Sequence, residues 1–283
     1  MSQDTFENGA ELSGPPGSPV APIESLDPTW LEIWYQPKID LRRKCLAGAE
    51  ALLRIDHPQS GLLWPEDYRD QLDEDELAKL IEPALIAVLG HWSVFAEAGF
   101  DLRLAINIPA PTLSRLPIKA LVKEHRPQSG NWPGLIFEVN EDQIVRNIAS
   151  TREIANELKA LGVAIAIDDF GAGYSSFSGL RDLPFAELKL HGSFVRNCAV
   201  DVTNAAICQT AIDFAHRFGS MAVAKDIKSI ADLQALVVMG CDFGQGMLVA
   251  PPMPKEQFLD ALRQHANGAR SQPRPGEDVG RVA

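Results

Sequence analysis

The chain has 283 residues, of which 46% are hydrophobic and 23% are charged, a composition typical of a globular protein. Its formal net charge of −12 argues against a surface that neutralises a nucleic-acid backbone, so no binding to DNA is expected. A small anion held in a pocket by a few local cations remains compatible with this charge.

Both ends of the chain are predicted to be disordered, and the part between them is predicted to be one domain. Residues 1–24 and 267–283 are rich in Gly, Pro, Ser and charged residues, which bury too little apolar surface to offset chain entropy. Residues 25–266 contain no evident linker or repeat. Apolar stretches such as 161–167 are far shorter than the roughly 20 residues of a membrane helix. We therefore expect a cytoplasmic protein without a membrane anchor.

Alternating or β-branched runs predict eight strands, at residues 31–41, 45–55, 102–108, 134–140, 163–170, 186–191, 221–227 and 242–249. Helical patterns lie between several of them, at 73–99, 150–162, 202–219 and 229–240. This alternation is typical of parallel strands joined by crossover helices. Only the segment LRRK separates the first two strands, which are therefore expected to pair as an antiparallel hairpin. The prediction is a modified TIM (β/α)8 barrel with its active site at the carboxyl ends of the strands.

Polar side chains follow several of these otherwise apolar strands. They are Glu50, Asn107, Glu138, Asp168 and Asp169. Each alone is most simply a helix cap or a solvated turn residue, but four strands that end in this way favour a common site. Carboxylates that converge in one cleft require a neutralising cation, and oxygen ligands indicate Mg²⁺ or Mn²⁺.

The order of these residues resembles the EAL family of cyclic di-GMP phosphodiesterases. The signature tripeptide is Glu50-Ala51-Leu52, followed by Arg54, and the segment DDFGAGYSS begins at Asp168. Further matches are YQP at 35–37, EVNE at 138–141, Lys189 and QG at 245–246. The resemblance extends over about residues 30–254, and it implies a barrel with one antiparallel strand, in agreement with the hairpin.

The resemblance also implies roles for individual residues. The ligands of a first divalent ion would be Glu50, Asn107, Glu138 and Asp168. Asp169 would help to hold a second ion, Lys189 would orient the attacking water or a phosphate, and Glu141 would brace the loop 171–176. The residues in contact with the nucleotide would be Gln36, Leu52, Arg54 and Gln245. Of these, Arg54 suits a phosphate or a guanine edge.

Two positions depart from the family pattern. A glutamate that helps to hold the second metal usually ends the seventh strand, in a segment resembling AEGVE, but this chain has Lys225 there. An ammonium group repels a second dication, so one metal site is expected and the second is doubtful. The K-x-D pattern of the sixth strand becomes Lys189-Leu190-His191. Asp226 is not expected to replace the lost carboxylate, because adjacent strand residues point to opposite faces.

Three functions remain open from the sequence. The first is a receptor that binds cyclic di-GMP with weak or absent hydrolysis, and the second is an active phosphodiesterase that produces linear pGpG. The third is a protein-interaction domain that no longer binds nucleotide. A regulatory protein partner is compatible with all three, and the resemblance adds an expectation of a homodimer.

Overall fold

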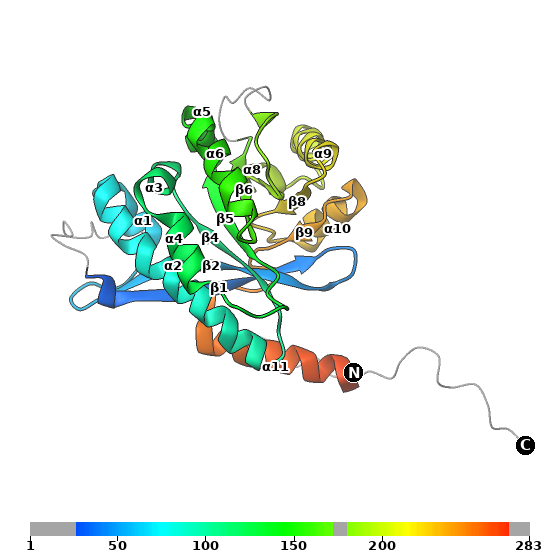
Figure 1. The fold of residues 1–283 in the computed structure, drawn as a ribbon. Coiled ribbons are helices and arrows are strands. Elements are labelled where there is room, and N and C mark those ends of the chain that lie inside the picture. Colours follow the sequence, from blue (N-terminus) through cyan, green and yellow to red (C-terminus); the bar gives the residue numbers. More distant parts are fainter. Residues whose placement is uncertain (1–26, 172–179, 272–283) are drawn as a thin grey trace, which may run out of the picture.

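The computed structural model describes residues 27–171 and 180–271, which form a closed barrel surrounded by helices (Figure 1). Its wall consists of β1 (Leu31–Asp40), β2 (Cys45–His57), β4 (Arg103–Asn107), β5 (Leu135–Asn140), β6 (Val163–Phe170), β7 (Glu187–Leu190), β8 (Met221–Ala224) and β9 (Phe243–Gly244). Two short strands, β3 (Gly61–Leu63) and β10 (Met253–Pro254), pair outside this ring with β2 and β1.

The strand β1 closes the barrel and runs antiparallel to both of its neighbours, β2 and β9. All other neighbouring strands of the ring are parallel. The turn 41–44 is too short for a crossover, which enforces the antiparallel pairing of β1 and β2. The predicted modified TIM barrel with one antiparallel strand is therefore confirmed.

Four helices lie at or close to the positions that the sequence predicts: α2 (Glu74–Glu97), α6 (Ile148–Lys159), α9 (Val202–Arg217) and α10 (Ile230–Met239). Asp73 begins α2 with a capping box, in which its carboxylate accepts from the Glu76 N–H and the Glu76 carboxylate accepts from the Asp73 N–H. The other helices are α1 (Pro65–Tyr68), α3 (Ala110–Arg115), α4 (Ile118–His125), α5 (Glu141–Arg146), α8 (Gly192–Val195) and α11 (Lys255–Ser271), with 3₁₀ turns η1 (Pro28–Trp30) and η2 (Arg69–Gln71).

Helix α11 continues to Ser271, past the predicted domain end at residue 266. The predicted leader 1–24 and the tail residues 272–283 lie outside the described residues. Among the described helices, α2 is long and apolar enough to cross a membrane by length and composition, a property that the short apolar runs of the sequence had not suggested. In this fold its apolar side chains, among them Leu85, Trp92 and Phe95, are buried in the core.

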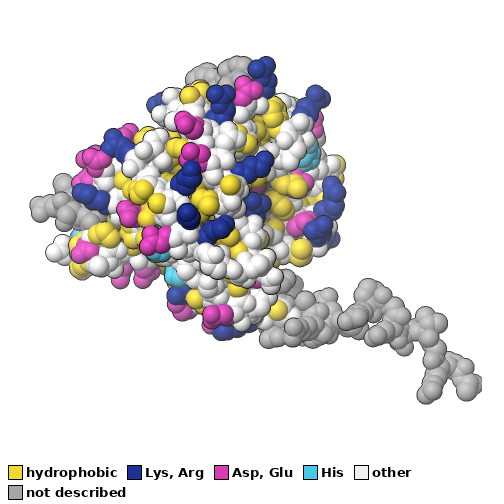
Figure 2. Space-filling model, viewed as in Figure 1, with side chains coloured by type: hydrophobic (Ala, Val, Ile, Leu, Met, Phe, Trp, Pro, Cys, Tyr) yellow, Lys and Arg dark blue, Asp and Glu magenta, His cyan; other side chains and the backbone are white. Residues whose placement is uncertain are grey.

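Lys and Arg side chains are scattered among acidic and hydrophobic ones on the face shown in Figure 2, rather than joined in one continuous band.

The interior of the barrel is layered because side chains two residues apart on a strand share a face. An apolar layer of Ala105, Ile136 and Ala166 forms a small cluster separate from the main core. Two residues further along the same three strands stand Asn107, Glu138 and Asp168. The spacing that packs the apolar layer therefore also places these polar side chains at the carboxyl mouth of the barrel.

A buried ion pair forms the layer at the opposite end. The Lys38 ammonium on β1 lies 2.6 Å from both carboxylate oxygens of Glu187 on β7, and both residues are buried. A buried charge is tolerated when its partner is present and becomes costly when the partner is removed.

We predict that Lys38→Met lowers the free energy of unfolding by about 3–5 kcal/mol, because it leaves the Glu187 carboxylate buried without its cation. Lys38→Met combined with Glu187→Leu removes both charges and is expected to recover most of this loss. Urea unfolding followed by circular dichroism measures both variants. A single variant as stable as the double variant would contradict the expectation.

Candidate functional site

The polar residues of the mouth are organised around the buried ammonium group of Lys189, which extends from β7 into the barrel. Its Nζ donates to a carboxylate oxygen of Glu50 at 2.7 Å and to one of Glu138 at shorter range. An oxygen of Asp168 lies 3.8 Å away. Three strands therefore bring their carboxylates to one lysine.

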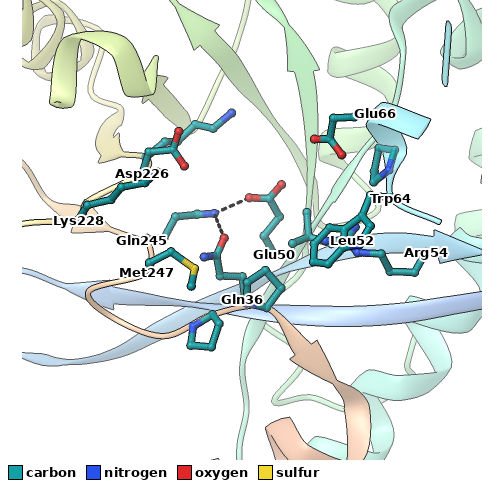
Figure 3. Close-up of a pocket in the computed structure, with 14 residues that line it drawn as sticks. Gln36, Glu50, Leu52, Arg54, Trp64, Glu66, Asp226, Lys228, Gln245 and Met247 are labelled. Atoms are coloured by element: carbon teal, nitrogen blue, oxygen red, sulfur yellow. Dashed lines mark hydrogen bonds between the residues drawn. The ribbon is translucent and has the colours of Figure 1, made fainter. Parts of the chain in front are cut away.

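Glu50 is the most highly coordinated of these carboxylates. In addition to Lys189, it accepts hydrogen bonds from the side-chain amides of Asn107 and Gln245, each at 2.6 Å. Gln245 also donates to the Gln36 side chain at 3.2 Å. Three residues from different parts of the barrel wall thus hold the Glu50 side chain in a single position (Figure 3 shows its contact with Gln245).

Lys225 supplies a second ammonium group at the mouth. Its Nζ lies 2.8 and 3.0 Å from the two carboxylate oxygens of Asp168 and 2.8 Å from an oxygen of Asp169. These adjacent aspartates reach the same lysine because Asp169 has a left-handed backbone (φ 55°) and the pairing of β6 with β7 is irregular there. Lys225 therefore occupies the oxygens that the family resemblance assigns to metal ions.

The two lysines change the acidity of the site. Burial alone would raise the pKa of Glu50, but the charges of Lys189 and Lys225 outweigh it and lower that pKa. Burial and the neighbouring Glu50 charge raise the pKa of Glu138 well above its ordinary value. Burial disfavours the charged form of Lys225, yet Asp168, Glu50 and Asp169 together raise its pKa. At Lys189, too, the nearby carboxylates outweigh burial and raise the pKa. Both lysines therefore stay protonated at neutral pH.

A pocket of about 630 Å³ opens above these residues (Figure 3). Gln36, Glu50 and Gln245 lie at its base. One side is formed by Lys225, Asp226 and Lys228, which follow β8, and the other by Leu52, Arg54, Trp64 and Glu66. Met247, Pro251 and Pro252 complete it. Its volume lies within the range of small-molecule sites.

Arg54 is buried but is not neutralised by an ion pair among the described residues. Its guanidinium lies 4.0 Å from the ring centre of Trp64 and donates to the Leu53 carbonyl at 2.7 Å. The Arg54 Nε is buried without a hydrogen-bond partner in this part of the chain. A cation of this kind, fixed by an aromatic ring, can pair with an anionic ligand.

The two residues that depart from the family pattern, Lys225 and His191, lie in different surroundings. The His191 ring does not line the pocket; it turns back to cap α8, where Nδ1 accepts from the Ser193 N–H at 3.3 Å and lies 2.7 Å from the Ser193 hydroxyl. Asp226, in contrast, does line the pocket beside Lys225. The expectation that these neighbours point to opposite faces is wrong, because β8 ends at Ala224 and Asp226 has a left-handed φ of 55°.

Glu141 contacts the loop that it is expected to brace, since its carboxylate accepts from the Gly171 N–H at 2.9 Å. Residues 172–176 of this loop lie outside the described residues.

Besides Asp226, the charged and aromatic residues of the pocket that were not expected from the sequence are Trp64, Glu66 and Lys228. Lys228 stands at the second glutamate of the AEGVE-like segment, and this substitution is a signal that the sequence offers. Trp64 and Glu66 flank a proline after β3, and this aromatic-proline-acid sequence at a strand end was an available but unspecific signal.

The fit of a metal ion differs between the two expected positions. At the mouth, four carboxylates outnumber the two ammonium groups of Lys189 and Lys225. The first set of expected ligands keeps the oxygen donors that Mg²⁺ and Mn²⁺ prefer; these ligands are Glu50, Asn107, Glu138 and Asp168. Within the described residues, however, no three His, Cys, Asp or Glu side chains are arranged to hold an ion. The first set keeps all its oxygen donors, although ammonium groups contact its three carboxylates. The second position does not fit, because Lys225 stands where the family pattern has a glutamate.

Comparisons with known proteins agree with this geometry. A model of the EAL domain family matches residues 24–252. The cyclic di-GMP phosphodiesterase RocR of Pseudomonas aeruginosa is 33% identical over 244 residues, which cover 84% of this chain and 61% of RocR. The chain thus spans less than two thirds of the length of this curated relative.

Two solved structures have the same barrel. The MucR phosphodiesterase in complex with c-di-GMP superimposes with a TM-score of 0.74 at 31% identity, over 81% of this chain and 94% of that one. The EAL enzyme Bd1971 in its form bound to cAMP and cyclic di-GMP gives 0.75 at 26% identity, over 82% and 65%. With its barrel, its strand-end residues and this match over most of its length, the chain belongs to the EAL domain family.

Proposed function

We propose that this EAL domain binds cyclic di-GMP at the mouth of the barrel and hydrolyses it weakly or not at all. The observation that carries the proposal is the contact of Lys225 with both Asp168 and Asp169. In two-metal hydrolysis the ions lie about 3.5–4 Å apart and together activate water and stabilise charge on phosphate. An ammonium group bound to the shared carboxylates prevents the second ion from binding.

Binding is supported by the pocket and by the relatives. Arg54 and Lys225 place cationic groups on its two sides, and Gln36 and Gln245 offer amides at its base. A dinucleotide with two phosphate charges matches this distribution. RocR is named a cyclic di-GMP phosphodiesterase and the MucR structure contains the dinucleotide, so the same ligand is proposed here.

We assign the metal only to the first position. Glu50, Asn107, Glu138 and Asp168 would hold one Mg²⁺ or Mn²⁺, which would stabilise negative charge on a phosphate oxygen. Lys189, which stays protonated beside Glu50 and Glu138, would orient the phosphate or a water molecule. Glu141 would position the loop at Gly171.

An active phosphodiesterase that releases pGpG is the second candidate. It is favoured by the retention of the first ligand set together with Lys189 and Asp169. A domain that binds only other proteins would leave the pocket without a ligand and is the least supported. A homodimer, a regulatory protein partner and a cytoplasmic location stay predictions.

We predict that the protein binds cyclic di-GMP in a calorimetric titration and that Arg54→Ala weakens this binding about tenfold to a hundredfold. A charge-assisted contact contributes about 1.5–3 kcal/mol, and each 1.4 kcal/mol is a factor of ten. Arg152→Ala on α6, an exposed arginine outside the pocket, is the matched control and should bind normally. No binding by the unaltered protein would remove the receptor proposal.

We also predict at most one tightly held divalent ion per chain, because Lys225 repels a second. Anomalous scattering from crystals grown with Mn²⁺ counts the ions directly. Two Mn²⁺ ions in the mouth of the unaltered protein would overturn this expectation.

Lys225→Glu is predicted to raise pGpG formation, since it returns a carboxylate to the second position, whereas Lys225→Ala removes charge without adding a ligand and is predicted not to. The double variant Lys225→Glu with His191→Asp tests whether residue 191 contributes as well; because the His191 side chain caps α8 outside the pocket, its exchange is expected to add little. The assay is hydrolysis under saturating Mn²⁺. A folded, nucleotide-binding double variant that is no faster than the parent would show that the defect lies elsewhere.

A further inference from the structure

The segment Trp64–Pro65–Glu66 forms a rigid part of the pocket wall between β3 and α1. The Trp64 N–H donates to the Asp67 carboxylate at 2.8 Å, and the Asp67 N–H donates to the Trp64 carbonyl at 2.9 Å. Tyr68, at the end of the same turn, is buried in a small apolar cluster. The Glu66 side chain therefore extends from a fixed backbone, and Figure 3 shows its carboxylate directed toward the pocket.

The Glu66 carboxylate lies in the first turn of α1 and lines the pocket. Within the described part of the chain, no hydrogen bond and no ion pair within 4 Å engages it, although Arg54 lies near enough to interact with it electrostatically. A negative charge on the wall of a pocket for a dianionic ligand is unfavourable by itself, because it repels the phosphates. Glu66 is exposed in the first turn of α1 and lies near Arg54, so the fold tolerates its charge. A ligand that presents hydrogen-bond donors to this wall would turn the carboxylate into a favourable contact.

Guanine presents such donors. Its N1–H and its exocyclic N2–H lie side by side, so that one carboxylate can accept from both, whereas adenine has an acceptor at N1 and no amino group at C2. A site that hydrogen-bonds one edge strongly rejects an analogue that lacks the donors, because its own polar group then stays unpaired.

The neighbouring indole supports a base at this place. Arg54 covers part of the Trp64 ring, and the remainder of the half-buried side chain lines the pocket beside Glu66 and Leu52. Aromatic rings are common stacking platforms for nucleobases and do not distinguish among them. Discrimination must then come from a polar group at the edge of the stacked base, and on this wall that group is Glu66.

We propose that Glu66 is the specificity-determining residue that selects guanine over adenine in the ligand, by accepting hydrogen bonds from N1–H and N2–H of one base. This inference rests on the proposed function, since it concerns the base of the same dinucleotide. It differs from the charge-assisted contact proposed for Arg54, because it depends on the hydrogen-bond donors of the base and not on a positive charge in the protein.

The test is a calorimetric titration of the full chain with cyclic di-GMP, cyclic di-IMP and cyclic di-AMP. Hypoxanthine keeps N1–H but lacks the N2 amino group, so affinity is expected to fall in that order. Glu66→Ala should weaken cyclic di-GMP binding on the order of tenfold or more and bring the three affinities close together. Glu66→Gln keeps one acceptor and should fall between Glu66→Ala and the parent. Glu153→Ala, an exposed glutamate on α6 outside the pocket, should leave all three affinities unchanged.

A purely electrostatic role of Glu66 predicts the opposite effect of Glu66→Ala on affinity. If Glu66 only repels the phosphates, Glu66→Ala strengthens binding of all three ligands, and that result overturns the inference. Unchanged binding, or an unchanged preference for guanine, overturns it as well. In these cases cyclic di-GMP still binds and depends on Arg54, so the proposed function survives. If the unaltered protein binds none of the three ligands, both the function and the inference fail.

Discussion

Four carboxylates, those of Glu50, Glu138, Asp168 and Asp169, lie together at the mouth of the barrel, and they cannot all stay ionised there without nearby positive charge. Lys189 and Lys225 provide part of that charge. The remaining negative charge must be balanced by a metal ion or removed by protonation of a carboxylate, and these two states support different chemistry. Burial, together with the charge of Glu50, raises the pKa of Glu138 in spite of the nearby Lys189.

The barrel itself follows from patterns that are visible in the sequence. The short LRRK segment dictates the antiparallel hairpin, and the two-residue spacing from Ala105, Ile136 and Ala166 places the polar residues of the mouth. The capping box at Asp73 begins α2 where the sequence indicates. These features are local or periodic, which is why a single sequence is sufficient to predict them.

The details of the site depend on backbone conformations that periodicity cannot describe. A left-handed backbone brings the Asp169 side chain to Lys225 and the Asp226 side chain to the pocket, where strict alternation would direct both away. His191 is a polar strand end in the sequence, yet its side chain caps the short helix α8. Glu66 and Trp64 join the site from a turn after β3, and only the packing of Tyr68 shows where that turn lies. These side-chain directions come from local backbone conformation at Asp169, Asp226 and His191, and from tertiary packing at Tyr68.

The apolar layer of Ala105, Ile136 and Ala166 separates two charged layers of the barrel, the Lys38–Glu187 pair at one end and the lysine-bridged carboxylates at the other. It insulates the base of the scaffold from changes of charge at the mouth. Moreover, Lys225 follows the last residue of β8, so its side chain is exchanged without disturbing the hydrogen-bonded ladder. An evolving lineage can thus reverse the sign of a residue at the mouth while the barrel keeps its fold.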